Sequence, residues 1–198
     1  SLLTSLKQIC SHPRVYDKES PAKSSLSGKA ELLLSLLHSI RSNGEKVLIF
    51  SQYVSTIETL QTIIEKEMHE ETVIFHGGMT RQKREEAVER FQKSGGPAVF
   101  LISLKAGGTG LNLTSANHVI HYDLWFNPAV EDQATDRAFR IGQNRNVFVH
   151  RLICDGTFEE KIDEMIQKKR AVQDLTVQSG EKWLTKLSDE ELMELFKG

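Results

Sequence analysis

The sequence predicts an α/β protein in which a parallel sheet is covered by helices on both faces. Short apolar runs such as Val47-Leu-Ile-Phe50 alternate along the chain with longer helical patterns. Short buried strands separated by helices of about ten or more residues are typical of such a sheet. Hydrophobic residues make up 39% of the 198-residue chain and charged residues 26%, which are ordinary values for a domain with a sizeable core.

The first 25 residues are expected to form a short helix and a polar linker outside the core. The helix has an apolar repeat and ends at His12-Pro13; the repeat consists of Leu2, Leu3, Leu6 and Ile9. Ser27 is then positioned to cap an amphipathic helix, Lys29–Ser42. The expected core stripe of this helix is Leu32, Leu33, Leu36, Leu37 and Ile40.

The alternation of strands and helices follows from residue 47 onward. Strands are expected at Val47–Phe50, Thr72–Phe75, Ala98–Ile102, His118–His121 and Val147–Ile153. Helices are expected at Val54–Glu67, Thr80–Lys93, Pro128–Arg140 and Phe158–Thr176, with a smaller helical tail at Glu181–Lys186 and Ser188–Lys197. The predicted organisation is therefore a leading helix and linker (1–25), an α/β lobe (26–157) and a helical extension (158–198).

Charge and composition exclude several functional classes. The net charge of −2 argues against a basic coat for nucleic acid, so any contact with a polyanion must be local. The two cysteines, Cys10 and Cys154, give neither a zinc spacing nor a disulfide framework, and no metal site is expected. No signal peptide or membrane span is seen, which predicts a soluble intracellular protein. A start at Ser1 without methionine suggests a piece of a longer chain.

One predicted helix, Pro128–Arg140, carries a group suited to phosphate. Gln133, Arg137 and Arg140 are spaced so that all three project from one face. Two guanidiniums and an amide aimed together form a fork that fits phosphate oxygens. Asp132, Asp136 and Arg140 follow one another at intervals of four residues. The spacing alone therefore fits a solvated ladder of ion pairs equally well.

Polar and glycine-rich loops follow three predicted strands, at the sheet edge where ligands bind in such folds. Ser51-Gln52-Tyr53 follows the first strand, and His76-Gly-Gly-Met-Thr80 follows the second, with Thr80 opening a helix. Taken alone, each segment fits a capped turn better than a binding loop. Lys83 and Arg84 are expected to be solvated, since the same helix carries three glutamates.

The loop after the third strand is the richest in glycine. It reads Ser103-Leu-Lys-Ala-Gly-Gly-Thr-Gly-Leu-Asn-Leu113, and its backbone N–H groups with Lys105 could grip a phosphate. By contrast, Ser25-Leu-Ser-Gly-Lys29 is not a P-loop, because Lys23 and Ala30 occupy positions that need Gly and Ser or Thr.

Four segments, in order and spacing, resemble motifs of the Swi/Snf-type ATPases of helicase superfamily two. The Phe50-Ser-Gln-Tyr block resembles motif IV, the loop ending at Leu113 resembles motif V, and Gln133-Ala-Thr-Asp-Arg-Ala-Phe-Arg-Ile-Gly-Gln143 resembles motif VI. His121-Tyr-Asp-Leu-Trp-Phe-Asn-Pro128 resembles the segment ahead of motif VI. The resemblance extends from about Leu2 to about Met165 and implies the second RecA-like lobe of a motor.

The resemblance also assigns roles to residues. Arg137 and Arg140 would be arginine fingers, reaching ATP that is held with Mg²⁺ by a first RecA-like lobe absent from this chain. Gln133, Gly110 and Asn112 would lie on the nucleotide side. Residues on the double-stranded DNA side would be Ser51, Gln52, Gly77, Gly78, Ser103, Lys105 and Trp125. Thr80 is added to this set because it opens a helix whose free N–H groups favour anions.

Two positions depart from the family pattern. Leu104 stands where many relatives have a threonine hydroxyl, and Phe139 replaces a common histidine between the arginines. A phosphate contact at the first position would pass to Ser103 or to backbone N–H groups, and an imidazole role at the second is excluded.

The resemblance implies a DNA-dependent ATPase and double-stranded DNA translocase, similar to chromatin remodellers, in the bacterial cytoplasm or the eukaryotic nucleus. This chain alone is expected to be inactive, because it has no Walker A lysine and no Asp-Glu pair for Mg²⁺. A non-catalytic DNA- or protein-binding regulatory domain remains the alternative. The oligomeric state, the translocation direction and the remodelling target are not indicated.

Overall fold

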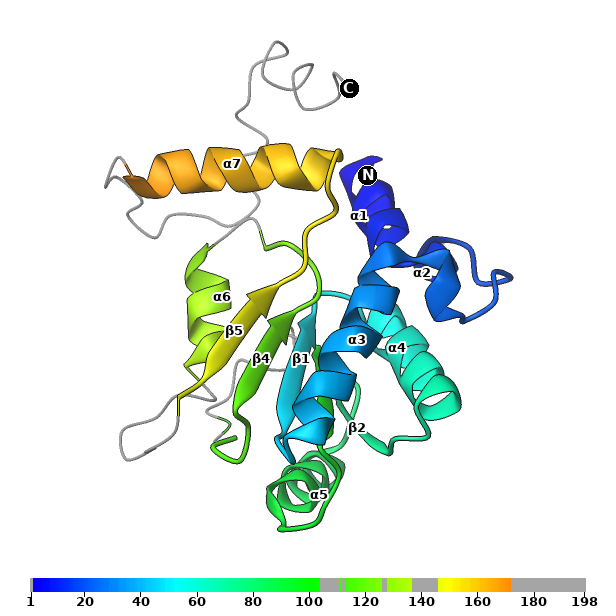
Figure 1. Ribbon diagram of the computed structural model, residues 1–198, viewed down its shortest axis with the longest axis vertical. Coiled ribbons are helices and arrows are strands. Elements are labelled where there is room, and N and C mark those ends of the chain that lie inside the picture. The colour runs from blue at the N-terminus through cyan, green and yellow to red at the C-terminus, as the bar shows by residue number, and fades with distance from the viewer. Residues whose placement is uncertain (1, 104–110, 112, 126–127, 137–145, 172–198) are drawn as a thin grey trace.

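The computed structural model of the chain describes residues 2–103, 111, 113–125, 128–136 and 146–171. Within these residues the chain forms a five-stranded sheet with helices on both faces, as expected from the sequence (Figure 1). The strands are β1 (Val47–Ser51), β2 (Thr72–Phe75), β3 (Val99–Ser103), β4 (His118–His121) and β5 (Phe148–Arg151). Their order across the sheet is β2-β3-β1-β4-β5, and every pairing is parallel.

The helices follow the predicted alternation closely. They are α1 (Leu2–Ser11), α2 (Pro13–Tyr16), α3 (Gly28–Ser42), α4 (Val54–Glu67), α5 (Arg81–Gln92), α6 (Pro128–Thr135) and α7 (Phe158–Ala171), with a 3₁₀ turn η1 (Ser24–Leu26). Ser27 caps α3 as predicted, since its side chain accepts a hydrogen bond from the N–H of Ala30. Thr80 caps α5 in the same way by accepting from the N–H of Lys83.

Two core layers lie on opposite faces of the sheet. Helices α3 and α4 cover one face through side chains such as Leu37 and Leu60, which meet Ile49 and Leu101 from the strands. Helices α5 and α6 cover the other face, where the fully buried Phe91 ring stacks on Phe100 at 5.0 Å between centroids. Every residue of β1 and of β3 is buried, because these central strands have a helical layer on both sides.

A third, smaller apolar cluster lies beyond the carboxyl ends of the strands. Helix α7 crosses this end of the sheet, and the N-terminal helix α1 lies beside it (Figure 1). Buried residues of α7, together with Leu124, pack here against partly buried Leu3, Leu6 and Cys10 of α1. The predicted leading and trailing segments therefore meet each other at the edge where ligands bind in α/β sheets.

Three details of the first helices differ from the prediction. Leu32 of the expected α3 stripe is 50% exposed and Leu36 is half-buried, because only one row of side chains, led by Leu33 and Leu37, faces the sheet. Ile9 of α1 is likewise 47% exposed. The expected linker contains the short helix α2, which buries Val15 and is started by Pro13 at its first turn.

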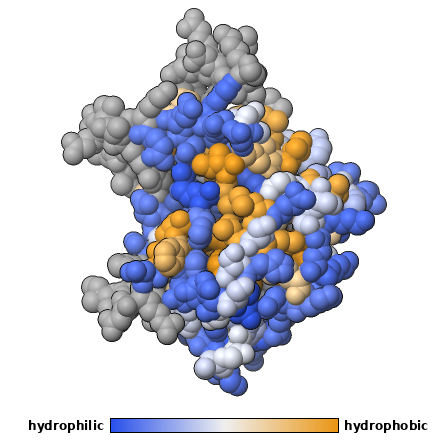
Figure 2. Space-filling view, viewed as in Figure 1, coloured by the Kyte–Doolittle hydropathy of each residue, from blue (hydrophilic) through white to orange (hydrophobic). Residues whose placement is uncertain are grey.

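The edge strand β5 also differs from the buried strand expected at Val147–Ile153. Phe148 and Val149 are 51% and 47% exposed, and apolar surface is visible over this strand (Figure 2). Among the described strands, β5 pairs with β4 alone and therefore forms an edge of the sheet. Two other expectations lie outside the described residues: the continuation of α7 to Thr176 and the two tail helices at Glu181–Lys186 and Ser188–Lys197.

None of the helices in the described part of the chain has the length and apolar character to cross a membrane.

Candidate functional site

The predicted site residues come from neighbouring strands at one edge of the sheet. Because all strands are parallel, the residues that follow β2, β3, β1 and β4 emerge side by side along the carboxyl edge. Gly77 and Gly78 follow β2, and Ser103 ends β3. Ser51 and Gln52 lie at the end of β1, and Trp125 follows β4. The fold therefore gathers along one edge the described residues that the resemblance assigned to DNA.

Asp123 is the centre of the polar network at this edge. Its carboxylate is 1% exposed and accepts hydrogen bonds from the Ser11 hydroxyl at 2.6 Å and the Gln52 N–H at 2.8 Å. The Ser51 hydroxyl is a third donor. A buried carboxylate is tolerated only when donors of this kind surround it. Asp123 thereby joins α1, the end of β1 and the segment after β4.

Ser51 and Gln52 are thus already engaged within the protein. Besides its N–H bond to Asp123, Gln52 donates its side-chain amide to the Leu124 carbonyl at 2.8 Å, and its amide oxygen accepts from Lys7 at 3.3 Å. Ser51 is buried. In this arrangement the two residues fix the loop after β1 and hold it against the loop after β4, and their contact with DNA stays a prediction.

Two other polar atoms at this edge are buried without a hydrogen-bond partner among the described residues. They are the Ser103 hydroxyl at the end of β3 and the indole N–H of Trp125. Each belongs to a residue that the resemblance placed on the DNA side. Buried polar atoms of this kind call for a partner, and a ligand or a neighbouring segment could supply it.

His121 connects the end of β4 to α6. Its ring stacks on Phe50 at 5.7 Å between centroids, and its Nε2 lies 3.0 Å from the Thr135 hydroxyl. Burial, with a smaller effect from Arg151, lowers the pKa of His121 to about 4. The imidazole is therefore neutral at physiological pH and acts as a structural link between strand and helix.

The start of α6 is held by a buried carboxylate. Glu131 is 4% exposed and accepts from the Trp125 N–H at 3.2 Å and from Arg151 Nε at 2.8 Å. Arg151 also forms an ion pair with Asp163 of α7 at 2.8 Å. The helix that begins motif VI is therefore tied to the edge strand, to α7 and to the segment containing Trp125.

The predicted nucleotide-binding residues are only partly described. Gln133 lies on the exposed face of α6, next to the buried Ala134. The N–H of Asp136 still donates to the Asp132 carbonyl at 2.9 Å, so helical hydrogen bonding reaches the last residue described in this segment. The expected continuation of the helix to Arg140 lies outside the described residues, as do Arg137, Arg140, Gly110, Asn112 and Lys105.

The loop after β2 is exposed and internally braced. Gly77, Gly78 and Thr80 are all exposed, and the Gly78 N–H donates to His76 Nδ1 at 3.2 Å. Arg84 donates to the Gly77 carbonyl at 2.7 Å and to the Met79 carbonyl at 3.1 Å. Arg84, predicted to be solvated, is half-buried, and its guanidinium also donates to the carbonyl oxygens of this loop.

Sequence reasoning did not select the residues that hold this edge together. Asp123, Ser11, Glu131 and Arg151 were not among the predicted site residues, although they link four separate elements here. A signal was available for Asp123, since it follows a predicted strand by two positions and so reaches the edge where ligands bind.

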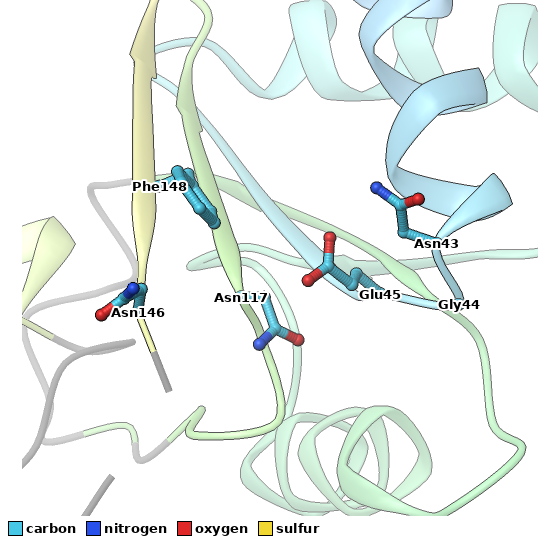
Figure 3. Close-up of a pocket in the computed structure, with 6 residues that line it drawn as sticks. All are labelled: Asn43, Gly44, Glu45, Asn117, Asn146 and Phe148. Carbon is cyan, nitrogen blue, oxygen red and sulfur yellow. The ribbon is translucent and has the colours of Figure 1, made fainter. Parts of the chain in front are cut away.

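A hollow elsewhere on the surface does not coincide with this site. Its volume is about 510 Å³, and it is lined by Asn43, Gly44, Glu45, Asn117, Asn146 and Phe148 (Figure 3). These residues precede β1, β4 and β5 or lie at their starts, so the hollow opens at the amino edge of the sheet. Ligands of parallel sheets bind at the other edge.

Comparisons with known proteins point to one family. The helicase conserved C-terminal domain family matches residues 28–142 of the chain. A Bacillus subtilis protein, YwqA, whose name describes an ATP-dependent helicase/translocase, is 51% identical over 99% of this chain and 21% of its own length. The human SWI/SNF-related matrix-associated actin-dependent regulator of chromatin subfamily A member 1 is 35% identical over 100% of this chain and 20% of its own length. The chain thus spans about a fifth of these relatives.

Solved structures agree with the sequence relatives. The C-terminal domain of the Sulfolobus solfataricus SWI2/SNF2 ATPase superposes with a TM-score of 0.80 at 37% identity, covering 98% of this chain and 78% of that one. The core of the same ATPase in complex with double-stranded DNA superposes with a TM-score of 0.85 at 40% identity, covering 98% of this chain and 40% of that one.

Proposed function

Since the chain belongs to the helicase conserved C-terminal domain family, as the C-terminal lobe of a SWI2/SNF2-type ATPase, we propose that it is half of a DNA motor. In this proposal it is the second RecA-like lobe of an ATP-dependent double-stranded DNA translocase. A first lobe, in the same longer protein, would bind ATP. The relatives named for ATP-dependent helicases and the neighbour bound to double-stranded DNA support this reading.

The observation that carries the proposal is the construction of the carboxyl edge. Asp123 fixes the motif IV loop against the segment ahead of motif VI through Ser51 and Gln52. Glu131 then fixes the start of the motif VI helix to that same segment. Motif IV, which is assigned to DNA, and motif VI, which is assigned to the nucleotide, are thereby joined through a few buried hydrogen bonds.

On the nucleotide side, we assign Arg137 and Arg140 to the γ-phosphate of ATP. Arginines that reach a bound nucleotide stabilise the charge that develops on the transferred phosphoryl group. Gln133, exposed on α6, would lie beside them, and Gly110 and Asn112 would complete this side. The anchoring of α6 by Glu131 and by Thr135 would keep this face directed toward the cleft between the lobes.

Mg²⁺ would be held by the first lobe. The three buried carboxylates at the described part of this edge, Asp123, Glu131 and Glu159, are already engaged by serine, backbone, arginine and lysine donors. A metal ion would have to displace those donors. The residues present therefore fit a lobe that stabilises phosphate charge and leaves metal binding to its partner lobe.

On the DNA side, we assign the backbone grip to loops from four strand ends. Contributors would be Ser51, Gln52, Gly77, Gly78, Thr80, Ser103, Lys105 and Trp125. The exposed N-terminus of α5 after Thr80 favours anions, and the glycines before it allow close approach of a phosphate. The Ser103 hydroxyl and the indole N–H of Trp125, which have no hydrogen-bond partner among the described residues, are further donors. Such contacts grip the duplex without reading its sequence.

The domain division is proposed as predicted, with a helicase lobe at 26–157 between the leading segment 1–25 and the extension 158–198. The apolar cluster shared by α1 and α7 supports a role for both extensions in bracing the carboxyl edge. A DNA substrate would place the whole protein in a bacterial cytoplasm or a nucleus.

The test uses the longer protein that contains the first lobe. Arg137→Ala and Arg140→Ala should each lower DNA-stimulated ATP turnover by about 10³-fold or more, because arginine fingers contribute about 10³–10⁵ in rate. Lysine at either position should not restore turnover, since a point charge cannot reproduce the planar fork. DNA affinity and melting temperature, measured on the same preparations, should stay within error.

Arg41→Ala serves as the matched control. Arg41 lies in the last turn of α3, which leads into the amino end of β1, and it pairs there with Glu70. Its turnover should match the parent protein. Turnover that survives both arginine substitutions within a few-fold would contradict the proposal. Steady ATP turnover by the 198-residue chain alone would also contradict it, because the chain would then hold a complete site.

A further inference from the structure

The only two cysteines of the chain lie together, although 143 residues separate them in sequence. Cys10 lies in α1, and Cys154 follows β5 just ahead of α7. The Cys154 Sγ is 3.5 Å from the Cys10 carbonyl oxygen. The two sulfur atoms and a Glu159 carboxylate oxygen all lie within 4.8 Å of one another. Two thiols at this distance form either a redox pair or a site for a soft metal ion.

The third member of this group, Glu159, is already engaged by other partners. Lys29 lies 2.7 Å from its carboxylate in a buried ion pair, and the Cys154 N–H donates to it at 3.0 Å. A cation bound here would have to compete with the Lys29 ammonium for the carboxylate and would lie close to that positive charge. The surroundings therefore favour the redox pair.

The loop that carries Cys154 is held in place but remains accessible. The Thr157 hydroxyl donates to the Cys154 carbonyl at 2.8 Å, which closes a turn ahead of α7. Both cysteines are half-buried, so a small oxidant or thiol can reach them. A fixed pair of thiols with partial access is the arrangement from which a disulfide forms readily.

The two thiols also differ in acidity. The hydrogen bond from Cys154 lowers the pKa of Cys10 against the opposing effect of burial. The same contact, followed by burial, raises the pKa of Cys154. Cys10 is thus the sulfur that becomes a thiolate, and Cys154 is the thiol that holds the proton.

We propose that Cys10 and Cys154 form a reversible intramolecular disulfide that fastens α1 to the connection between β5 and α7. With a peroxide as oxidant, the Cys10 thiolate attacks one peroxide oxygen and becomes a sulfenic acid, while the other oxygen takes up a proton and leaves as water. The Cys154 sulfur then displaces the sulfenic oxygen, which leaves as a second water with the Cys154 proton. A reducing dithiol restores both thiols.

The disulfide would act where the N-terminal helix meets the proposed site. Helix α1 packs on α7 through the small cluster around Leu3, Leu6 and Cys10, and the neighbouring Ser11 donates to Asp123. Oxidation would make this contact covalent until the disulfide is reduced, and it would close a long loop. The reduced chain relies on non-covalent packing of α1 at the same place.

The proposal is tested on the purified chain with hydrogen peroxide in a metal-chelating buffer. The count of reactive thiols should fall from two to none, and non-reducing peptide mapping should recover one linked pair of peptides containing Cys10 and Cys154. The melting temperature should rise by roughly 5–10 °C and return on reduction, since a cross-link of this span constrains the unfolded chain. Cys10→Ser and Cys154→Ser should give neither the linked peptides nor the rise.

Three results would overturn the proposal. The first is that both thiols stay free under peroxide that oxidises glutathione. The second is that the cysteines oxidise without a Cys10–Cys154 link, whether to acids or to disulfides between chains. The third is stoichiometric Zn²⁺ binding that is lost in either serine variant and is not abolished by prior peroxide treatment, which would identify a metal site.

Discussion

At the scale of single residues, the carboxyl edge depends on buried polar side chains that find their hydrogen-bond partners inside the protein. Asp123 accepts hydrogen bonds from α1 and from the end of β1, and it is 1% exposed. His121, two positions earlier, is equally buried, and burial stabilises its neutral ring.

The neutrality of His121 predicts a loss of stability in mild acid. Its pKa is about 4 in the folded chain and 6.5 as an ordinary value, so the unfolded chain binds the proton more readily. The contribution of His121 is therefore complete above pH 6.5 and is lost as the pH falls from about 6.5 to about 4. Between pH 7.5 and 5 the free energy of unfolding should fall by about 2 kcal/mol from this group. Urea unfolding at the two pH values measures the change.

His121→Gln provides the control, since an amide can still reach the Thr135 hydroxyl but does not titrate. This variant should lose most of the fall between pH 7.5 and 5. A smaller fall of the same sign remains from His150, whose pKa is lowered by burial and by His118. An identical pH dependence in the parent and in His121→Gln would show that the pKa of His121 does not differ between the folded and unfolded chains.

At the scale of elements, α7 is joined to the rest of the lobe by a buried ion pair. Lys29 at the start of α3 lies 2.7 Å from Glu159 of α7, and the two side chains are 3% and 1% exposed. Lys29 also donates to the Tyr122 carbonyl at 3.2 Å, so three elements meet at this ammonium group. Charges removed from water in this way are tolerated only while each keeps its partner.

Removing one partner of this pair should therefore be costly. Lys29→Met leaves the Glu159 carboxylate buried without its counter-charge, and the free energy of unfolding should fall by about 3–5 kcal/mol. The double variant Lys29→Met with Glu159→Gln removes both charges and should be more stable than the single Lys29 variant. Chemical denaturation of the parent, of Lys29→Met and Glu159→Gln alone, and of the double variant gives the coupling between the two positions.

An exposed pair offers the comparison. Arg81 and Glu85 also lie 2.7 Å apart, but their side chains are 92% and 64% exposed. Arg81→Met should leave the melting temperature nearly unchanged, because water solvates the remaining carboxylate. Equal effects of Arg81→Met and Lys29→Met on stability would show that burial does not govern the strength of the Lys29–Glu159 pair.

At the scale of the whole molecule, the parallel sheet brings the proposed DNA contacts to its carboxyl edge, where they are few. The chain has a net charge of −2, so its proposed grip on DNA depends on one edge and not on a basic surface. Most of the candidate contacts at that edge are hydroxyls, amides and backbone N–H groups, with Lys105 as the cation assigned there. Weak and sequence-independent binding follows from such a set.

Binding of short duplexes should therefore depend only shallowly on salt. The slope of log K against log salt should be about −0.9 for each phosphate contacted, and Lys105→Ala should reduce its magnitude by about 0.9 while weakening all sequences equally. Fluorescence anisotropy at several salt concentrations measures both effects. Lys66→Ala, near the exposed end of α4, removes the same charge elsewhere and should change neither quantity. A sequence-selective loss for Lys105→Ala would count against a grip on the backbone.

Local sequence patterns were sufficient to predict the elements and the edge that carries the site. The apolar runs at Val47–Phe50 and Thr72–Phe75 and the caps Ser27 and Thr80 are properties of neighbouring residues, and all are found where they were expected. The motifs after the strands predicted the family, which the comparisons confirm. Since parallel strands send their carboxyl ends to one edge, the order of elements along the chain was enough to place these motifs together.

Only the tertiary structure decided which distant residues meet. The strand order puts β5 at an edge, which leaves Phe148 and Val149 exposed although the sequence suggested a buried strand. Ser11 reaches Asp123, Lys29 reaches Glu159 and Cys10 reaches Cys154 across more than half of the chain. The local sequence around each partner carries no signal for these contacts. They form because helices α1, α3 and α7 are packed against the completed sheet, and that packing is a property of the whole fold.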